Sequence, residues 1–119
     1  FSAGLGIGWG ALEALTSPTF NLVHEHHRVK DTTRLFHMDA YRLRGSADLP
    51  SIGWEDILTQ RGVIVIEWAE LILDALPKDH LWVELRVIES IRRNLVFEPH
   101  GDRYHHLMKE FLTANATRY

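Results

Sequence analysis

The stretch that decides the fold is Val63-Ile64-Val65-Ile66-Glu67-Trp68. Its first four residues are β-branched and apolar with no polar residue between them, which predicts a strand that is buried on both faces. Such strands lie inside parallel sheets that helices cover on either side, so we expect an α/β fold. Glu67 then stands at the carboxyl end of the strand, at the edge where α/β proteins bind ligands.

A carboxylate at the end of a buried strand allows two interpretations. In nucleotide hydrolases, an acid in this place holds magnesium or orients the attacking water. Alternatively, Glu67 is only the first solvated residue after a strand. A second acid, Asp39, follows the predicted strand Arg34 to Met38 in the same way, and it favours the first interpretation.

The remaining pattern predicts strands separated by helical segments and then an antiparallel hairpin near the C-terminus. The expected elements are the end of a helix over residues 4–10, a strand over 20–26, a helix over 46–60 in two pieces broken by Pro50, a short helical or irregular segment over 69–76, a hairpin of residues 81–88 and 94–97, and a final helix capped by Asp102. We expect the strands over 20–26, 34–38 and 63–66 to share one sheet. Asp39 and Glu67 should then emerge at the same edge of that sheet, and residues 63–66 should be almost fully buried.

Length, charge and composition restrict the class of protein. The 119 residues fit a single domain spanning residues 1–119. The 13 Lys and Arg against 16 Asp and Glu give a net charge of −3, which does not favour direct binding of nucleic acid. Cysteine is absent, so disulfides and thiolate metal sites are excluded, and a reducing cytoplasm fits. No apolar stretch is long enough to cross a membrane.

Histidines and glycines gather in two places without forming a recognisable site. His24, His26 and His27 raise the possibility of zinc, but a zinc site needs three or four convergent ligands and no further group is spaced to complete one. We therefore expect a solvated strand end there. The alternating glycines from Gly4 to Gly10 do not fit G-x-G-x-x-G, and no segment fits G-x-x-x-x-G-K-[ST].

Three motifs put polar or acidic groups at strand ends, where a magnesium–phosphate site needs them. They read Thr16-Ser17-Pro18-Thr19-Phe20, His37-Met38-Asp39-Ala40-Tyr41-Arg42-Leu43 and Ile66-Glu67-Trp68-Ala69-Glu70. In this order and spacing they resemble the bacterial TsaE family, small P-loop ATPases needed to make threonylcarbamoyladenosine in tRNA. The family's motifs are approximately T-S-P-T-[FY]-x-L-V, H-x-D-x-Y-R-L and [IV]-E-W. The resemblance covers roughly residues 4–97.

The resemblance implies ATP and Mg²⁺ as cofactors and assigns three catalytic residues. Thr19, together with Ser17, would sit in a switch-like loop that faces the γ-phosphate. Asp39 would act on the magnesium side of the site, directly or through a water. Glu67 would help to hold the metal or position the attacking water.

The resemblance also implies residues that bind the nucleotide. Trp68 would pack beside it, and Arg92, in the loop between the last two strands, would contact ATP. Arg93 is an equally good candidate for that contact. The family's phosphate-binding loop has no counterpart in this sequence. We expect the first strand and this loop to precede Phe1 in the intact protein, and this chain alone to bind ATP weakly or not at all.

By the same resemblance, the intact protein is a P-loop NTPase-like ATP hydrolase of the cytoplasm that works with the TsaD and TsaB proteins. It would meet tRNA only indirectly, through that complex. Two alternatives stay open, because strand-end acids do not distinguish them. One is a P-loop kinase of a small molecule, and the other is a non-catalytic interaction module that has lost its P-loop.

Overall fold

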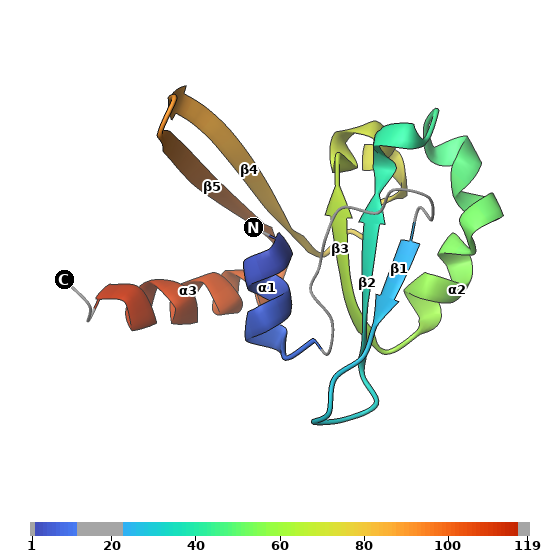
Figure 1. The fold of residues 1–119 in the computed structure, drawn as a ribbon, viewed down its shortest axis with the longest axis horizontal. Helices are drawn as coiled ribbons and strands as arrows, with labels where there is room; N and C mark the ends of the chain where they lie inside the picture. Colours follow the sequence, from blue (N-terminus) through green and yellow to red (C-terminus); the bar gives the residue numbers. More distant parts are fainter. Residues whose placement is uncertain (1, 12–22, 117–119) are drawn as a thin grey trace. The chain divides into compact units, whose positions relative to one another are not determined.

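A computed structural model describes residues 2–11 and 23–116 of the chain (Figure 1). The chain forms two compact units, Phe1–Ala75 and Leu76–Tyr119. The first unit contains helix α1 (Ser2–Trp9) and a three-stranded sheet with its connections. The second contains a two-stranded hairpin and helix α3 (Asp102–Ala116). The longest helix of the described ranges has 15 residues. No helix in these ranges is long and apolar enough to cross a membrane.

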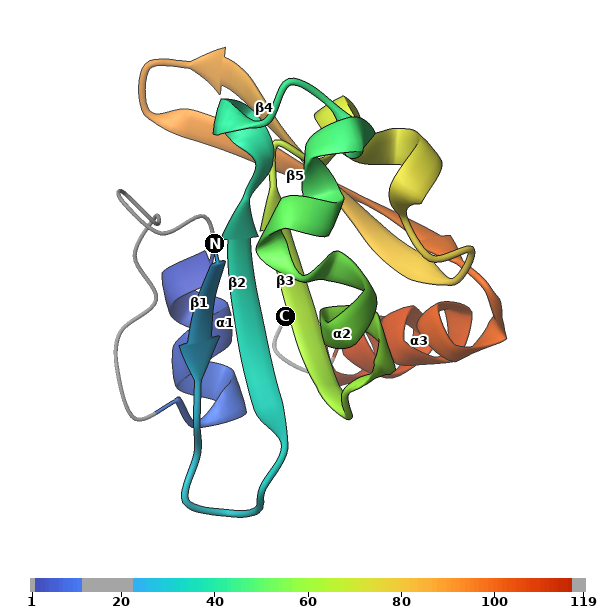
Figure 2. The ribbon, with the colours of Figure 1, turned by 90° about the vertical axis from the view of Figure 1, so that its right-hand side faces the viewer.

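The sheet of the first unit has the order β1-β2-β3 (Figure 2). Strand β1 (Val23–His26) runs antiparallel to β2 (Arg34–Asp39), and β3 (Gly62–Glu67) runs parallel to β2. The three predicted strands therefore share one sheet, as expected. The first residues of the predicted strand over 20–26 lie outside the described residues.

Strand β2 has a neighbour on both edges, and it carries the core of the unit. Its residues Leu35, Phe36, His37 and Met38 are at most 5% exposed. By contrast, residues 63–66 of β3 are only half-buried, so the prediction that they are almost fully buried is wrong. The reason is that β3 pairs only with β2 within the part of the chain that the structure describes, and side chains beside an unpaired edge stay partly exposed.

The connection from β2 to β3 consists of short helical segments along one side of the sheet (Figure 2). They are η1 (Ala40–Arg42), η2 (Ser46–Ile52) and α2 (Trp54–Thr59). Pro50 lies inside η2, and the break predicted there falls instead at Gly53, whose φ of 76° is a conformation that favours glycine. A proline's fixed φ of about −65° is compatible with a 3₁₀ segment, so Pro50 does not interrupt it.

Two helical segments complete the first unit. The segment η3 (Ala69–Ala75) follows β3, and its Ile72 is fully buried. Helix α1 ends at Trp9, and the amide of the following Gly10 donates to the Gly6 carbonyl at 3.0 Å. The end of α1 is held by Arg28, whose guanidinium lies 4.6 Å from the centre of the Trp9 ring.

The second unit confirms the predicted hairpin and lengthens it. Strands β4 (His80–Glu89) and β5 (Arg92–His100) are antiparallel, and α3 packs on β5 through a contact between Phe97 and Phe111. Asp102 was predicted to cap this helix, but it is the first residue of α3. Gly101 precedes it, and its carbonyl accepts a hydrogen bond from the His105 amide at 3.1 Å. Gly101 is thus the N-cap residue, and it has no side chain that could accept from the first helical amides.

Candidate functional site

The two strand-end acids of the first unit lie side by side. Asp39 and Glu67 end β2 and β3 and are register partners in this parallel pair, so they emerge at the same edge as predicted. His37 is the register partner of Val65, two residues earlier on each strand. Because side chains alternate between the two faces of a strand, His37, Asp39 and Glu67 share one face of the sheet.

Glu67 is hydrogen-bonded to His37. The His37 Nε2 lies 2.9 Å from the Glu67 Oε2, and because a carboxylate only accepts, Nε2 carries the hydrogen and donates it. The His37 side chain is fully buried, whereas that of Glu67 is 32% exposed. The second ring nitrogen of His37, Nδ1, has no hydrogen-bond partner among the described residues. The ring therefore joins the core of the sheet to the exposed strand end.

Asp39 has a structural task at the end of β2. Its Oδ1 accepts a hydrogen bond from the Tyr41 amide at 2.9 Å and so caps η1. This contact fixes the direction of the side chain relative to the backbone. A carboxylate has two oxygens, so capping through Oδ1 is compatible with a metal or a water bound through Oδ2.

An aromatic pair lies next to the acids. Trp68 follows Glu67 directly, and its backbone has a φ of 59°, in the left-handed region that residues with a Cβ rarely adopt. Its ring centre lies 5.1 Å from that of Tyr41. Both side chains are largely exposed, at 53% for Trp68 and 64% for Tyr41. Strained backbone of this kind gathers at functional sites, which fits the place of Trp68 at the strand end.

The other predicted site residues are either outside the described residues or in the second unit. Ser17 and Thr19 lie outside the described residues. Arg92 belongs to the second unit and is the first residue of β5, not a loop residue, with its Nη1 3.8 Å from the Glu89 carboxylate. Arg93 donates from its Nη1 to the backbone carbonyl of Glu89 at 3.0 Å. A contact of either arginine with ATP stays a prediction.

His26 differs from the expectation of a solvated strand end. Its side chain is buried, at 5% exposure, because β1 pairs with the central strand β2. His27, just beyond the strand, is exposed.

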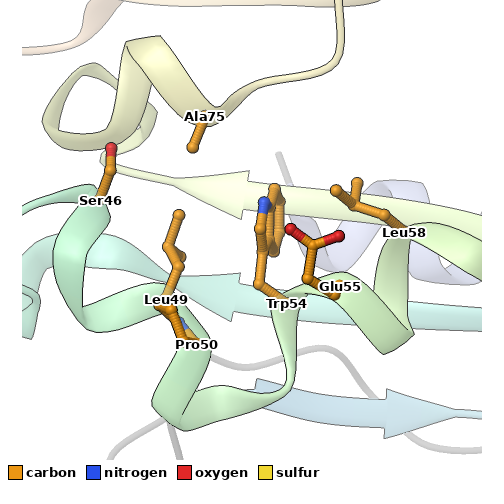
Figure 3. A pocket seen from close by; sticks show the side chains of 7 residues that line it. All are labelled: Ser46, Leu49, Pro50, Trp54, Glu55, Leu58 and Ala75. Atoms are coloured by element: carbon orange, nitrogen blue, oxygen red, sulfur yellow. The ribbon is translucent and has the colours of Figure 1, made fainter.

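A cavity of about 240 Å³ lies in the first unit between η2, α2 and η3 (Figure 3). It is lined by Ser46, Leu49, Pro50, Trp54, Glu55, Leu58 and Ala75. Its volume is below the range of about 300–1,000 Å³ that is usual for ligand pockets. None of its lining residues is one of the residues that the sequence predicts for the site.

The two strand-end acids have the chemistry that magnesium requires. Mg²⁺ prefers oxygen ligands, and proteins usually bind it through one or two carboxylates, with waters and phosphate oxygens as the other ligands. Asp39 and Glu67 supply two carboxylates from adjacent positions of a rigid sheet. Two carboxylates match what proteins usually supply to Mg²⁺, and within the described residues no group of three or more His, Cys, Asp and Glu side chains could hold a metal without further ligands.

Comparison with known proteins assigns the chain to a family. The family model described as "Threonylcarbamoyl adenosine biosynthesis protein TsaE" matches residues 1–95. The chain belongs to the TsaE family. This finding confirms the resemblance that the three motifs indicate.

Two curated relatives named tRNA threonylcarbamoyladenosine biosynthesis protein TsaE illustrate the similarity. The protein of Treponema pallidum is 38% identical over 95 residues, which are 80% of this chain and 68% of the relative. The protein of Bacillus subtilis is 30% identical over 110 residues, 92% of this chain and 67% of the relative.

A solved structure confirms the fold of this TsaE-family chain. The structure titled "Crystal structure of Bacillus subtilus YdiB" matches with a TM-score of 0.69 and 27% identity, over 96% of this chain and 68% of that one. The predicted P-loop NTPase-like α/β fold with a C-terminal antiparallel hairpin is thereby confirmed.

Proposed function

We propose that the protein containing this chain takes part in making threonylcarbamoyladenosine in tRNA, as an ATP hydrolase that uses Mg²⁺. Membership of the TsaE family and the names of the relatives support the pathway. The observation that carries the hydrolase proposal is the register pair Asp39 and Glu67 at the carboxyl edge of two parallel strands. This is the edge at which α/β proteins bind nucleotides.

The bound magnesium ion would neutralise charge on the phosphate oxygens. Asp39 and Glu67 would hold it, and Glu67 would also orient the attacking water. The hydroxyls of Thr19 and Ser17 would face the γ-phosphate. Reaction to free phosphate needs little covalent chemistry from the protein, so positioning of these groups is the main contribution of the chain.

Nucleotide binding would involve one residue next to Glu67 and one arginine of the second unit. Trp68 would pack beside the nucleotide, and Arg92 would contact ATP, with Arg93 as the alternative. No segment of the 119 residues reads G-x-x-x-x-G-K-[ST], the loop whose amides and lysine cradle phosphates. The chain thus supplies the acids of the site but no phosphate cradle of this type, and hydrolysis is to be measured on the complete protein.

The partners would be proteins of the TsaD and TsaB type in the cytoplasm. The net charge of −3 fits contact with tRNA only through such a complex, because direct contacts with phosphates need clustered Lys and Arg. If the protein works with these partners, addition of TsaD and TsaB to the complete protein should increase phosphate release.

The test is to replace each acid by its amide in the complete protein. Glu67→Gln and Asp39→Asn should each lower phosphate release roughly 100-fold or more, because they remove charge where charge develops in the reaction. Both changes are nearly isosteric, so the thermal midpoint should hardly move. Asp56→Asn, an exposed acid on α2, is the matched control and should leave the rate unchanged.

The same assay distinguishes the alternatives. A kinase would transfer phosphate to an added acceptor and release little of it as free phosphate. A non-catalytic module would release none, with or without TsaD and TsaB. Normal phosphate release from either amide variant would refute the assigned role of that acid.

A further inference from the structure

His37 is a buried polar residue to which the motif comparison gives no role. It lies on the central strand β2, its side chain is fully buried, and it faces the same side of the sheet as both acids. The one side-chain hydrogen bond of His37 among the described residues joins Nε2 to the Glu67 Oε2 at 2.9 Å. Packing alone does not explain the ring, because Nδ1 is buried with no hydrogen-bond partner among the described residues, and a buried unpaired polar atom is destabilising.

We propose that His37 is the positioning residue for Glu67: it holds the carboxylate in the orientation that the metal or the attacking water requires. This inference rests on the proposed function of Glu67. His37 itself touches neither substrate nor metal, and it acts only through the acid.

The geometry supports this role because the two partners differ in freedom. Glutamate has three side-chain torsions, one more than histidine, so fixing the orientation of its carboxylate requires contacts at the end of the side chain. The His37 ring has two torsions and is enclosed by the core, so its N–H points in one direction. A hydrogen bond from a fixed donor selects one orientation of the carboxylate.

The sheet itself sets the distance between the two groups. His37 and Glu67 stand on adjacent strands whose register is fixed from Arg34–Gly62 to Asp39–Glu67. Groups held on strands keep their geometry better than groups on loops, and a misplacement of about 1 Å can lower a rate roughly 100-fold. The contact is therefore suited to control the rate of the chemical step.

Two variants of the complete protein separate positioning from packing. His37→Leu removes the donor but keeps a buried side chain of similar size. We expect kcat to fall roughly 10- to 100-fold with KM within about twofold, while the thermal midpoint stays or rises. His37→Gln places an amide N–H near the position of Nε2 and should recover most of the lost kcat. Met38→Leu, buried on the opposite face of β2, is the control and should change neither value.

A double-mutant cycle tests whether His37 acts through Glu67. In a Glu67→Gln background, His37→Leu should lower the residual rate no further, because the carboxylate that it positions is gone. A purely structural histidine would lower the rate by the same factor in both backgrounds.

Three results would overturn the proposal: a normal kcat for His37→Leu, a loss of kcat that only follows a lower thermal midpoint, or additivity in the cycle. Each of these is distinct from failure of the proposed function, which appears as normal phosphate release from Glu67→Gln alone.

Discussion

Strands β2 and β3 are neighbours of equal length, yet their burial is the reverse of what their sequences suggest. β3 reads Gly-Val-Ile-Val-Ile-Glu and is the more apolar, but residues 63–66 are only half-buried. β2 reads Arg-Leu-Phe-His-Met-Asp and includes a histidine, but residues 35–38 are at most 5% exposed. The difference is the number of neighbouring strands, two for β2 and one for β3 within the described residues. Position in the sheet therefore decides burial more than the hydrophobicity of the strand.

The largest expected effect on the free energy of unfolding comes from truncating a large apolar side chain to alanine, and the same change can be made in both strands. Leu35→Ala should lower the free energy of unfolding of the complete protein by about 3–4 kcal/mol, because a fully buried side chain leaves a cavity. Ile66→Ala on β3 should cost only about 1–2 kcal/mol, because water already reaches that side chain. Urea denaturation measures both. An equal loss would break the comparison, since it would mean that a further segment covers the outer edge of β3.

A smaller effect tests how closely the two strands approach at their start. A Cβ added at Gly62 would overlap the backbone carbonyl oxygen of Arg34, its register partner. Gly62→Ala should therefore destabilise the protein by about 1–3 kcal/mol.

Gly8 is the control for this substitution. It lies in α1, and an added Cβ would have no atom of the described residues within 4 Å apart from its own helix backbone and chain neighbours. Gly8→Ala should therefore stabilise the protein by about 0.5–1 kcal/mol. The sign of the change in thermal midpoint distinguishes the two variants. A harmless Gly62→Ala would show that β3 can shift against β2.

The smallest effect lies outside both strands, in the loop between β1 and β2. The Arg28 guanidinium donates to Asp31 at 2.7 and 2.8 Å and holds the pKa of that carboxyl well below its usual value of 3.8. Because the pKa is lower in the folded state, the contact contributes to stability above pH 3.8, and the contribution is lost as the pH falls below that value. Both groups are exposed, so the effect on unfolding should be slight.

An NMR titration of the Asp31 carboxyl measures this pKa directly. In Arg28→Gln, the pKa should return toward its usual value. An unchanged titration curve would show that the pair does not persist in solution. The result also bears on strand β2. Asp31 accepts a hydrogen bond from the Thr33 amide, so a persistent Arg28–Asp31 pair would hold the residue before β2 in place.

Much of the fold was predictable because it depends on local patterns. The unbroken run from Val63 to Ile66 predicted β3, and the segment from Arg34 to Met38 was predicted as the strand that leads to Asp39. The carboxyl edge that joins Asp39 and Glu67 followed from the rule that parallel strands end on the same side. These inferences need only the period of a strand and the direction of the chain.

The predictions that failed, or were not made, depend on partners elsewhere in the chain. The burial of residues 63–66 depends on how many strands flank them, which their own sequence does not contain. The break was predicted at Pro50 because proline usually interrupts helices. It lies instead at Gly53, which adopts a left-handed conformation. His37 had a visible signal, its spacing of two residues from Asp39, which puts both on one face. Its bond to Glu67 required the register of β2 against β3.

The parallel pairing of β2 with β3 also has a consequence in time. Asp39 and Glu67 are separated by 28 residues of chain, whereas the partners Glu89 and Arg92 at the hairpin turn are three apart. Local hairpins close within about 1–10 μs, but distant partners must first bring a long loop together. During synthesis at about 5–20 residues per second, Asp39 leaves the ribosome roughly 1–6 s before Glu67. For those seconds Asp39 has no partner carboxylate on a neighbouring strand, so the edge that pairs the two acids forms only once β3 has been made.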